Sequence, residues 1–198
     1  MLPDGLASVT LRRVGRPVGE AGFAVVDVET TGLVPGTDRV VEVAVVRTDA
    51  HGTVVDEWSS LVDPGRDPGA SDVHGITLAD LQGAATFAEI APELARRLEG
   101  RVLVAHNLAF DAAFLDAEQR PSLRGATGGL CTLELSRAVL GRPAGGWSLG
   151  ALCSEVGVPL DDAHRALADA RATAGLLEAL LTEVPAHPGL FSRRLAAN

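Results

Sequence analysis

Apolar residues in the first third of the chain gather in short valine-rich runs, which predict β-strands. Residues 22–28 (GFAVVDV) and 39–47 (RVVEVAVVR) are nearly continuous apolar runs, and residues 52–62 (GTVVDEWSSLV) alternate apolar and polar positions. Short runs of this kind, bounded by turn residues, favour strands over helices. Residues 63–77 (DPGRDPGASDVHGIT) are rich in Gly, Pro and Asp and are predicted to be a loop. The pattern therefore indicates three neighbouring strands followed by a loop.

Further along the chain the apolar spacing becomes helical. Residues 87–98 repeat apolar positions at helical steps, after which residues 101–105 (RVLVA) return to a strand. Three more segments, at about 108–119, 132–140 and 148–156, are predicted to be helices between Gly-rich breaks. A final helix carries its apolar residues on one face, at Leu167, Ala170, Ala174, Leu177 and Leu181. This order of elements predicts an α/β domain, with a mixed sheet and helices on its faces.

Length and composition favour one domain. The chain has 198 residues, of which 46% are hydrophobic, enough for one substantial core. We expect the domain to span residues 21–183, between an N-terminal extension at 1–20 and a tail at 184–198. The chain does not start with a basic region followed by an apolar stretch, and no run approaches the roughly 18 apolar residues of a membrane span. These features predict a cytoplasmic protein with no membrane partner.

The charge of the chain narrows the classes of function. A net charge of −9 argues against a protein that coats duplex phosphate, because such binding needs many cationic contacts. Any nucleic acid would instead have to be held locally, through a metal site. All 17 basic residues are Arg, which excludes a P-loop or Schiff-base lysine. Cys131 and Cys153 lack the spacing of a metal or redox motif and are predicted to be packing residues.

Two acidic residues end the first predicted strand. Asp27 and Glu29 are two positions apart, so their side chains leave the same face of the strand. At an effective dielectric of 20, two carboxylates about 4 Å apart repel by roughly 4 kcal/mol, which a cation or solvent must relieve. Taken alone, the pair is equally compatible with an exposed strand end, because Thr30-Thr31-Gly32 is a plausible turn.

A third acid follows a later strand. Asp111 closes the segment HNLAFD directly after RVLVA, at the carboxyl end of that strand, where active sites of parallel sheets collect. The structural alternative is an acid that only meets the dipole of its own helix, an interaction worth about 0.3–1 kcal/mol.

The last candidates open the final helix. His164 and Asp169 are five residues apart, so within one helix their side chains would point about 140° apart. They can converge only if His164 precedes the helix. The loop that begins at Pro159, with Asp162 as a possible N-cap, allows this arrangement.

The motifs together resemble a known family. Between Phe23 and Leu181 the chain carries, in order, VVDVETTGL, VHGIT, LVAHNLAFDAAFL, WSLGALCSEVGV and AHRALADARAT. This series resembles the DEDDh exonucleases, most closely the DnaQ-like branch that includes the proofreading epsilon subunit of bacterial DNA polymerase III. The resemblance implies a ribonuclease-H-like exonuclease fold with strand order 3-2-1-4-5 and the first three strands antiparallel. It also implies 3′→5′ hydrolysis of single-stranded or frayed DNA to nucleoside 5′-monophosphates, in proofreading or repair.

The resemblance also assigns roles to residues. Its metal ligands would be Asp27, Glu29, Asp111 and Asp169, and its general base would be His164. These carboxylates would hold two divalent cations, Mg²⁺ or Mn²⁺, both of which prefer oxygen ligands. Two such ions stabilise the entering and leaving oxygens of a phosphodiester, and an imidazole with a pKa near 6.5 suits proton abstraction from water. Contacts to the terminal nucleotide would come from Thr30, Thr31, Leu33, His106, Asn107 and Phe110, although a core role for Phe110 is as plausible.

Two other functions fit the same residues. The first is an exonuclease that trims the 3′ ends of RNA or short oligonucleotides with the same five catalytic residues. The second is a noncatalytic module that binds a DNA polymerase subunit and uses the acidic cluster as a structural metal site. Release of 5′-mononucleotides from a labelled oligonucleotide would reject the second alternative.

Overall fold

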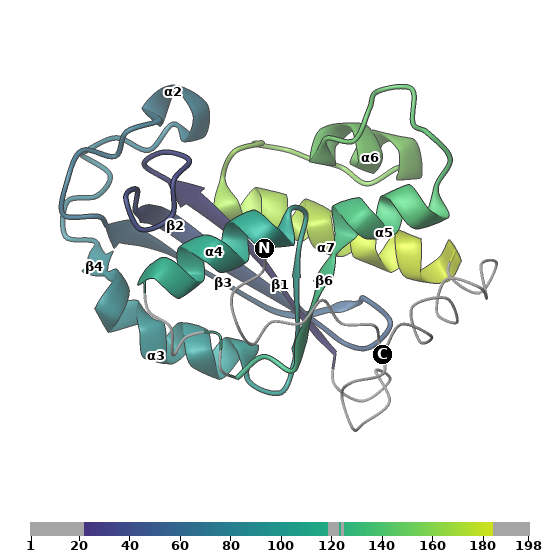
Figure 1. Ribbon diagram of the computed structural model, residues 1–198, viewed down its shortest axis with the longest axis horizontal. Coiled ribbons are helices and arrows are strands. Elements are labelled where there is room, and N and C mark those ends of the chain that lie inside the picture. The colour runs from purple at the N-terminus through teal and green to yellow at the C-terminus, as the bar shows by residue number, and fades with distance from the viewer. Residues whose placement is uncertain (1–21, 119–122, 124, 184–198) are drawn as a thin grey trace.

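A mixed six-stranded sheet forms the centre of the molecule (Figure 1). The computed structural model describes residues 22–118, 123 and 125–183. Three antiparallel strands come first, and each of the later three pairs in parallel with a neighbour. The strands are β1 (Phe23–Thr30), β2 (Val40–Thr48), β3 (Val54–Asp63), β4 (Ala85–Thr86), β5 (Val102–Ala105) and β6 (Gly128–Cys131), in the order β4-β3-β2-β1-β5-β6.

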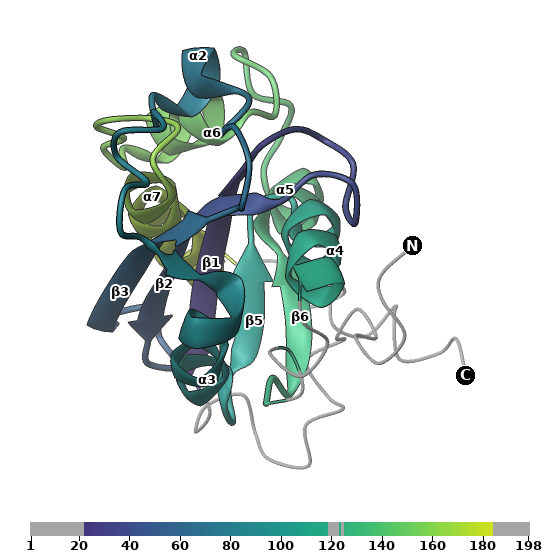
Figure 2. The same cartoon turned by 90° about the vertical axis from the view of Figure 1, so that its left-hand side faces the viewer.

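Helices cover both faces of this sheet. In Figure 1, α3 and α4 lie towards the left of the molecule and α5, α6 and α7 towards the right, and Figure 2 shows α4 and α7 on opposite sides of the sheet. Their bounds are α2 (Ser71–His74), α3 (Phe87–Leu98), α4 (Leu108–Glu118), α5 (Thr132–Val139), α6 (Leu149–Val156) and α7 (Ala166–Glu183). No helix in the described ranges has the length and apolar character needed to cross a membrane.

The sheet divides the core into two layers, and the side chains of β1 point alternately into one and the other. Ala24, Val26 and Val28 pack with residues of α3 and α4. Phe23 and Val25 point to the opposite face and pack with α5, α6 and α7. Because side chains alternate along a strand, Asp27 and Glu29 continue the row of Phe23 and Val25 on the face that α7 covers.

The architecture confirms the expected fold. When the two-residue β4 is left aside, the strand order is the expected 3-2-1-4-5, and β1, β2 and β3 are antiparallel. The observed bounds differ from the expected ones by at most two residues for most elements, and the bounds of α3 agree at both ends. The proposed extension at 1–20 and tail at 184–198 lie outside the described residues.

Two features of the fold correct or extend the sequence-based expectation. Residues 63–77 are not entirely loop, because Ser71–His74 form the single turn α2, which ends at Gly75 in the left-handed conformation. The last strand, β6, has the sequence GGLC, which shows neither alternation nor a valine run. It is a strand because its backbone pairs with β5 over four residues. The side chains of β6 give no sign of this pairing in the sequence.

Candidate active site

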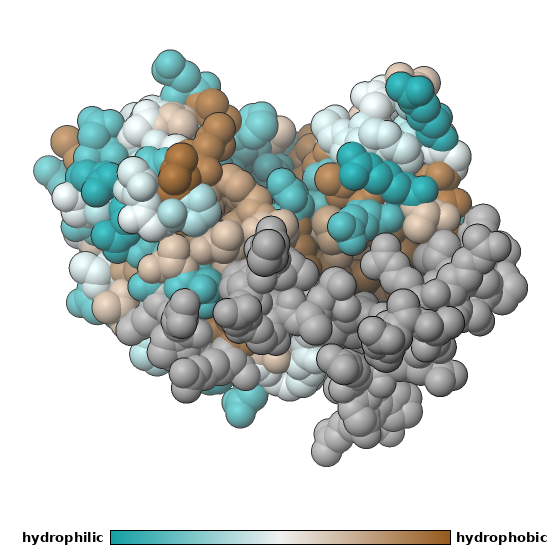
Figure 3. Space-filling view, viewed as in Figure 1, coloured by the Kyte–Doolittle hydropathy of each residue, from teal (hydrophilic) through white to brown (hydrophobic). Residues whose placement is uncertain are grey.

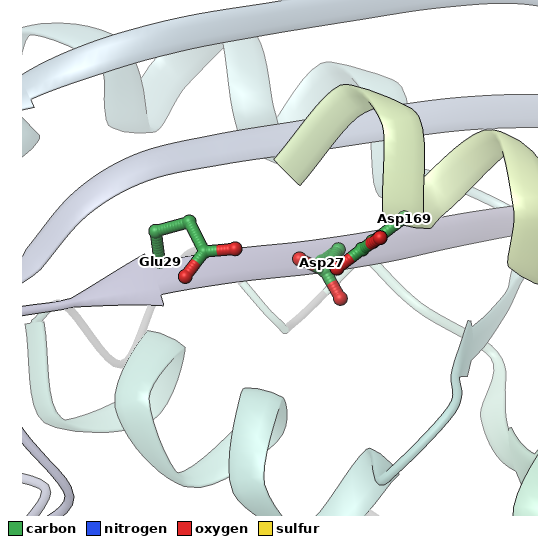
Figure 4. A group of neighbouring side chains, drawn as sticks. All are labelled: Asp27, Glu29 and Asp169. Atoms are coloured by element: carbon green, nitrogen blue, oxygen red, sulfur yellow. The ribbon is translucent and has the colours of Figure 1, made fainter. Parts of the chain in front are cut away.

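Three carboxylates converge where the apolar row of β1 gives way to acids. Asp27 and Glu29 come from β1, and Asp169 comes from the first turn of α7, which crosses that face of the sheet (Figure 4). One oxygen from each of the three lies within 4.8 Å of the others. As predicted from their two-residue spacing, Asp27 and Glu29 lie on the same face of β1, and the fold brings Asp169 to them from a distant segment.

Asp111 lies beside this cluster. It is in the first turn of α4, immediately beyond the end of β5, and is 5% exposed. Its charge is one of the causes that raise the pKa of Asp27. Burial raises the pKa of Asp111 itself, and hydrogen bonds from the backbone N–H groups of Asp111 and Val28 offset this rise only in part. The tightest group is thus Asp27, Glu29 and Asp169, with Asp111 as a close neighbour of Asp27.

The cluster is electrostatically costly without a counter-charge. Burial, followed by the repulsion of Asp111 and Asp169, raises the pKa of Asp27 well above its ordinary value. Burial, with repulsion from Asp169 and Glu42, raises the pKa of Glu29 to about 7. The pKa of Asp111 is also raised to about 7, mainly by burial. Carboxylates that resist ionisation together are stabilised by a bound cation, which favours their charged forms.

The donor set fits a hard divalent cation. Every candidate ligand is a carboxylate oxygen, the type that Mg²⁺ and Mn²⁺ prefer. Among the described residues, Oδ1 of Asp169 is one of the few buried side-chain atoms that lack a hydrogen-bond partner. A buried charged oxygen without a donor is unfavourable, so an ion at this position would satisfy it.

His164 lies just outside α7, as the angular argument from the sequence required. α7 begins at Ala166, and the backbone N–H of His164 donates to Oδ2 of Asp169 at 3.2 Å. His164 has a φ of 68°, which is uncommon for a residue other than Gly, and its side chain is exposed. The expected N-cap at Asp162 is wrong, because the helix starts four residues later and its first amide is bound by Glu42.

Three further candidates lie at the end of β1 and in the loop that follows it. Thr30 is 7% exposed, and its hydroxyl donates to the carbonyl of Gly32 at 2.6 Å. The hydroxyl of Thr31 donates to Asp38 and accepts from the backbone N–H of Arg39. Leu33 is 80% exposed, the most exposed large apolar side chain among the described residues. The two hydroxyls therefore shape the loop, while Leu33 is free to meet another molecule.

The three candidates that follow β5 differ in how far their side chains are engaged within the protein. The ring nitrogens of His106 lie 3.1 Å from the hydroxyl of Thr132 and 3.2 Å from the carbonyl of Trp147, so both are used within the protein. Phe110 packs on Phe114 with ring centroids 4.8 Å apart and borders the α3–α4 core. Of these three residues only Asn107 is exposed, while His106 and Phe110 are half-buried.

Glu42 is a residue of the site that sequence reasoning missed. It pairs with Glu29 across β1 and β2, is 4% exposed, and accepts hydrogen bonds from Arg165 and from the backbone of Ala166. Its signal in the sequence is a single acid inside the apolar run VVEVAVV, which is unfavourable in a buried strand unless the charge is paired.

The chain is similar to known nucleases. Residues 24–177 match the exonuclease family model RNase_T. The chain is 40% identical over 176 residues to a DNA polymerase III subunit epsilon-like protein of Rhodobacter capsulatus, which covers 86% of this chain and 25% of that protein. It is 35% identical over 160 residues to a PolC-type DNA polymerase III of Thermotoga maritima, which covers 79% of this chain and 12% of that protein. The chain therefore spans a quarter or less of these two relatives.

Solved structures share the fold. Exonuclease X in complex with 5′ overhanging duplex DNA superposes with a TM-score of 0.63 at 29% identity, over 81% of this chain and 91% of that one. Exonuclease I of E. coli in complex with a dT13 oligonucleotide gives a TM-score of 0.74 at 20% identity, over 86% of this chain and 43% of that one. At 20% identity, the similarity to exonuclease I shows a shared fold and nothing further.

Proposed function

Because the chain belongs to the exonuclease family whose model covers residues 24–177, we propose that it removes nucleotides from the 3′ end of single-stranded or frayed DNA. The products are nucleoside 5′-monophosphates, and the activity serves proofreading or repair. The observation that carries the proposal is the convergence of Asp27, Glu29 and Asp169 beside an exposed histidine that precedes α7. DNA is the substrate class favoured by the relatives, which are named as DNA polymerase III proteins.

In this proposal each residue has a chemical role. Asp27, Glu29, Asp111 and Asp169 hold two divalent cations, Mg²⁺ or Mn²⁺. When bound, these ions supply the positive charge that offsets negative charge on the entering and leaving oxygens. His164 accepts the proton of the attacking water, and its exposed ring beside Asp169 gives it access to that water. The loop after β1, with Thr30, Thr31 and Leu33, borders the terminal nucleotide, together with Asn107 and the ring faces of His106 and Phe110.

We place the DNA strand in a hollow of the surface. On the face shown in Figure 3, a hollow at the upper edge separates the part that carries α2 from the part that carries α6. The net charge of −9 disfavours broad contact with phosphates, so binding through cations at one point fits this protein better than binding along a duplex. A DNA polymerase subunit is the proposed partner, since the relatives are much longer polymerase III proteins.

The test is direct. Matched DNA and RNA oligonucleotides, labelled at either end, are incubated with Mg²⁺ or Mn²⁺, and products are separated by length. We expect a descending ladder from the 5′-labelled DNA and immediate mononucleotides from the 3′-labelled DNA, with Asp27→Asn inactive. Faster degradation of RNA would reassign the substrate. If nucleotides are released with neither Mg²⁺ nor Mn²⁺, the result would support the noncatalytic polymerase-binding module.

A further inference from the structure

Glu42 holds a negative charge inside the sheet, next to the carboxylate cluster. It lies on β2 with its carboxylate on the α7 side, where Ala44 and Val46 of the same strand also pack. Its side chain is 5% exposed. Buried carboxylates are retained in proteins only where donors satisfy their oxygens, so the donors of Glu42 indicate what it does.

Within the described part of the chain, the donors to the Glu42 carboxylate are the two residues that follow His164. Oε2 accepts from Nε of Arg165 at 3.2 Å and from the backbone N–H of Ala166 at 3.1 Å. Oε1 accepts from Nη2 of Arg165 at 3.1 Å. Ala166 is the first residue of α7, so the carboxylate also meets the positive end of the helix. Glu42 thus attaches the entry of α7 to the middle of β2.

Hydrogen bonds within the described residues hold His164 by its backbone and not by its imidazole. No described residue makes a hydrogen bond to the ring, and the hydrogen bond of His164 is made by its backbone to Asp169. Its φ of 68° is a conformation that residues other than Gly rarely adopt, so surrounding contacts must maintain it. Asp169 holds the N–H of His164, and Glu42 holds the next two residues.

We propose that Glu42 is a positioning residue for His164, keeping the imidazole at the edge of the carboxylate cluster through Arg165 and Ala166. The inference rests on the proposed role of His164 as general base. Glu42 also adds negative charge close to Glu29 and Asp169, so the competing role is an electrostatic one at the cations. The two roles differ in which measurement changes when Glu42 is replaced.

The chain offers a matched control. Glu118 is also enclosed, with a side chain 3% exposed, and accepts from Nε and Nη2 of Arg39 and from the backbone N–H of Val40. This is the donor pattern of Glu42, but on a segment that does not lead to His164. Glu42→Gln and Glu118→Gln therefore remove the same kind of contact and differ in what the contact holds.

The kinetic experiment is a double-mutant cycle with His164→Ala on a single-stranded DNA oligonucleotide. We expect Glu42→Gln to lower kcat about 10–100-fold, with KM and the Mn²⁺ dissociation constant changed by less than about threefold. In the His164→Ala background, Glu42→Gln should have less than about a twofold effect, because the residue it positions is gone. Glu118→Gln should leave kcat within about twofold of wild type. Equal losses in both backgrounds, or weakened Mn²⁺ binding that accounts for the loss, would overturn the proposal.

A second measurement does not depend on turnover. The imidazole resonances of His164, labelled with ¹³C, should shift or broaden in Glu42→Gln and stay unchanged in Glu118→Gln. An unchanged spectrum in folded Glu42→Gln would reject the positioning role. If the wild-type protein released no nucleotide while the spectrum responded to Glu42→Gln, the proposed function would fail and the structural attachment of His164 to Glu42 would stand.

Discussion

The carboxylate of Asp169 accepts a hydrogen bond of 3.2 Å from the backbone N–H of His164 through Oδ2, while its buried Oδ1 has no hydrogen-bond partner. One side chain therefore faces both parts of the site. Through one oxygen it holds the loop that carries the histidine, and its other oxygen is left for a cation beside Asp27 and Glu29. Although His164 and Asp169 are five residues apart, they come together because α7 begins between them, at Ala166.

Replacement of Asp169 should separate these two roles. In Asp169→Asn the amide oxygen can still accept from His164, but the amide group cannot supply a charged ligand. We expect a folded protein whose Mn²⁺ affinity falls by about 10-fold or more and whose turnover falls by about 100-fold or more. Calorimetric titration with Mn²⁺ and the oligonucleotide assay check this, and an Asn variant with wild-type Mn²⁺ affinity would contradict the assignment of Asp169 as a ligand.

Stability of the metal-free protein should fall as pH rises toward neutrality. Burial raises the pKa of Glu29 from 4.5 to about 7 and that of Asp111 from 3.8 to about 7. Between the unfolded and folded pKa values the folded state binds more protons than the unfolded state, so the free energy of unfolding decreases with pH. Melting temperatures in EDTA should decline from about pH 4.5 to about pH 7. In a buffer that contains Mn²⁺ in place of EDTA, this decline should be reversed. Glu29→Gln should flatten the profile, whereas a rising profile in EDTA would contradict the raised pKa values.

His164→Ala should keep the fold and metal binding but lose most turnover. A general base contributes about 10²–10⁴-fold, so kcat should fall within that range. The variant His164→Gly gives a matched comparison, because Gly accepts a φ of 68° without the strain that Ala would have. The Gly variant should be about 1 kcal/mol more stable than the Ala variant in urea unfolding. Wild-type turnover by either variant across pH 6 to pH 9 would contradict the assigned role.

Leu33 should affect substrate binding without affecting stability. Its side chain is 80% exposed on the loop after β1, so Leu33→Ala removes little buried area. We expect a melting temperature close to that of wild type and a KM for single-stranded DNA raised by about 3–10-fold. Val55→Ala is the control, since Val55 is 57% exposed near the start of β3, at the end of the β2–β3 pair away from Glu42. A similar change in KM for both variants would argue against a contact specific to Leu33.

The sequence alone determined the elements whose signal lies within a few neighbouring residues. The valine runs identified β1 and β2, and the helical repeat of apolar residues identified Phe87–Leu98 as α3 at both ends, because side-chain periodicity reports directly on local conformation. The same local geometry predicted that Asp27 and Glu29 share a face and that His164 precedes α7.

Only the tertiary structure decided the features that depend on partners far along the chain. β6 is a strand because β5 lies beside it, and Asp169 joins Asp27 because α7 crosses the acidic end of β1. The amide that opens α7 is bound by Glu42 rather than by Asp162. Local propensity names residues that can bind cations or cap a helix, but hydrogen bonds and charge clusters between distant segments form only when burial has set their separation.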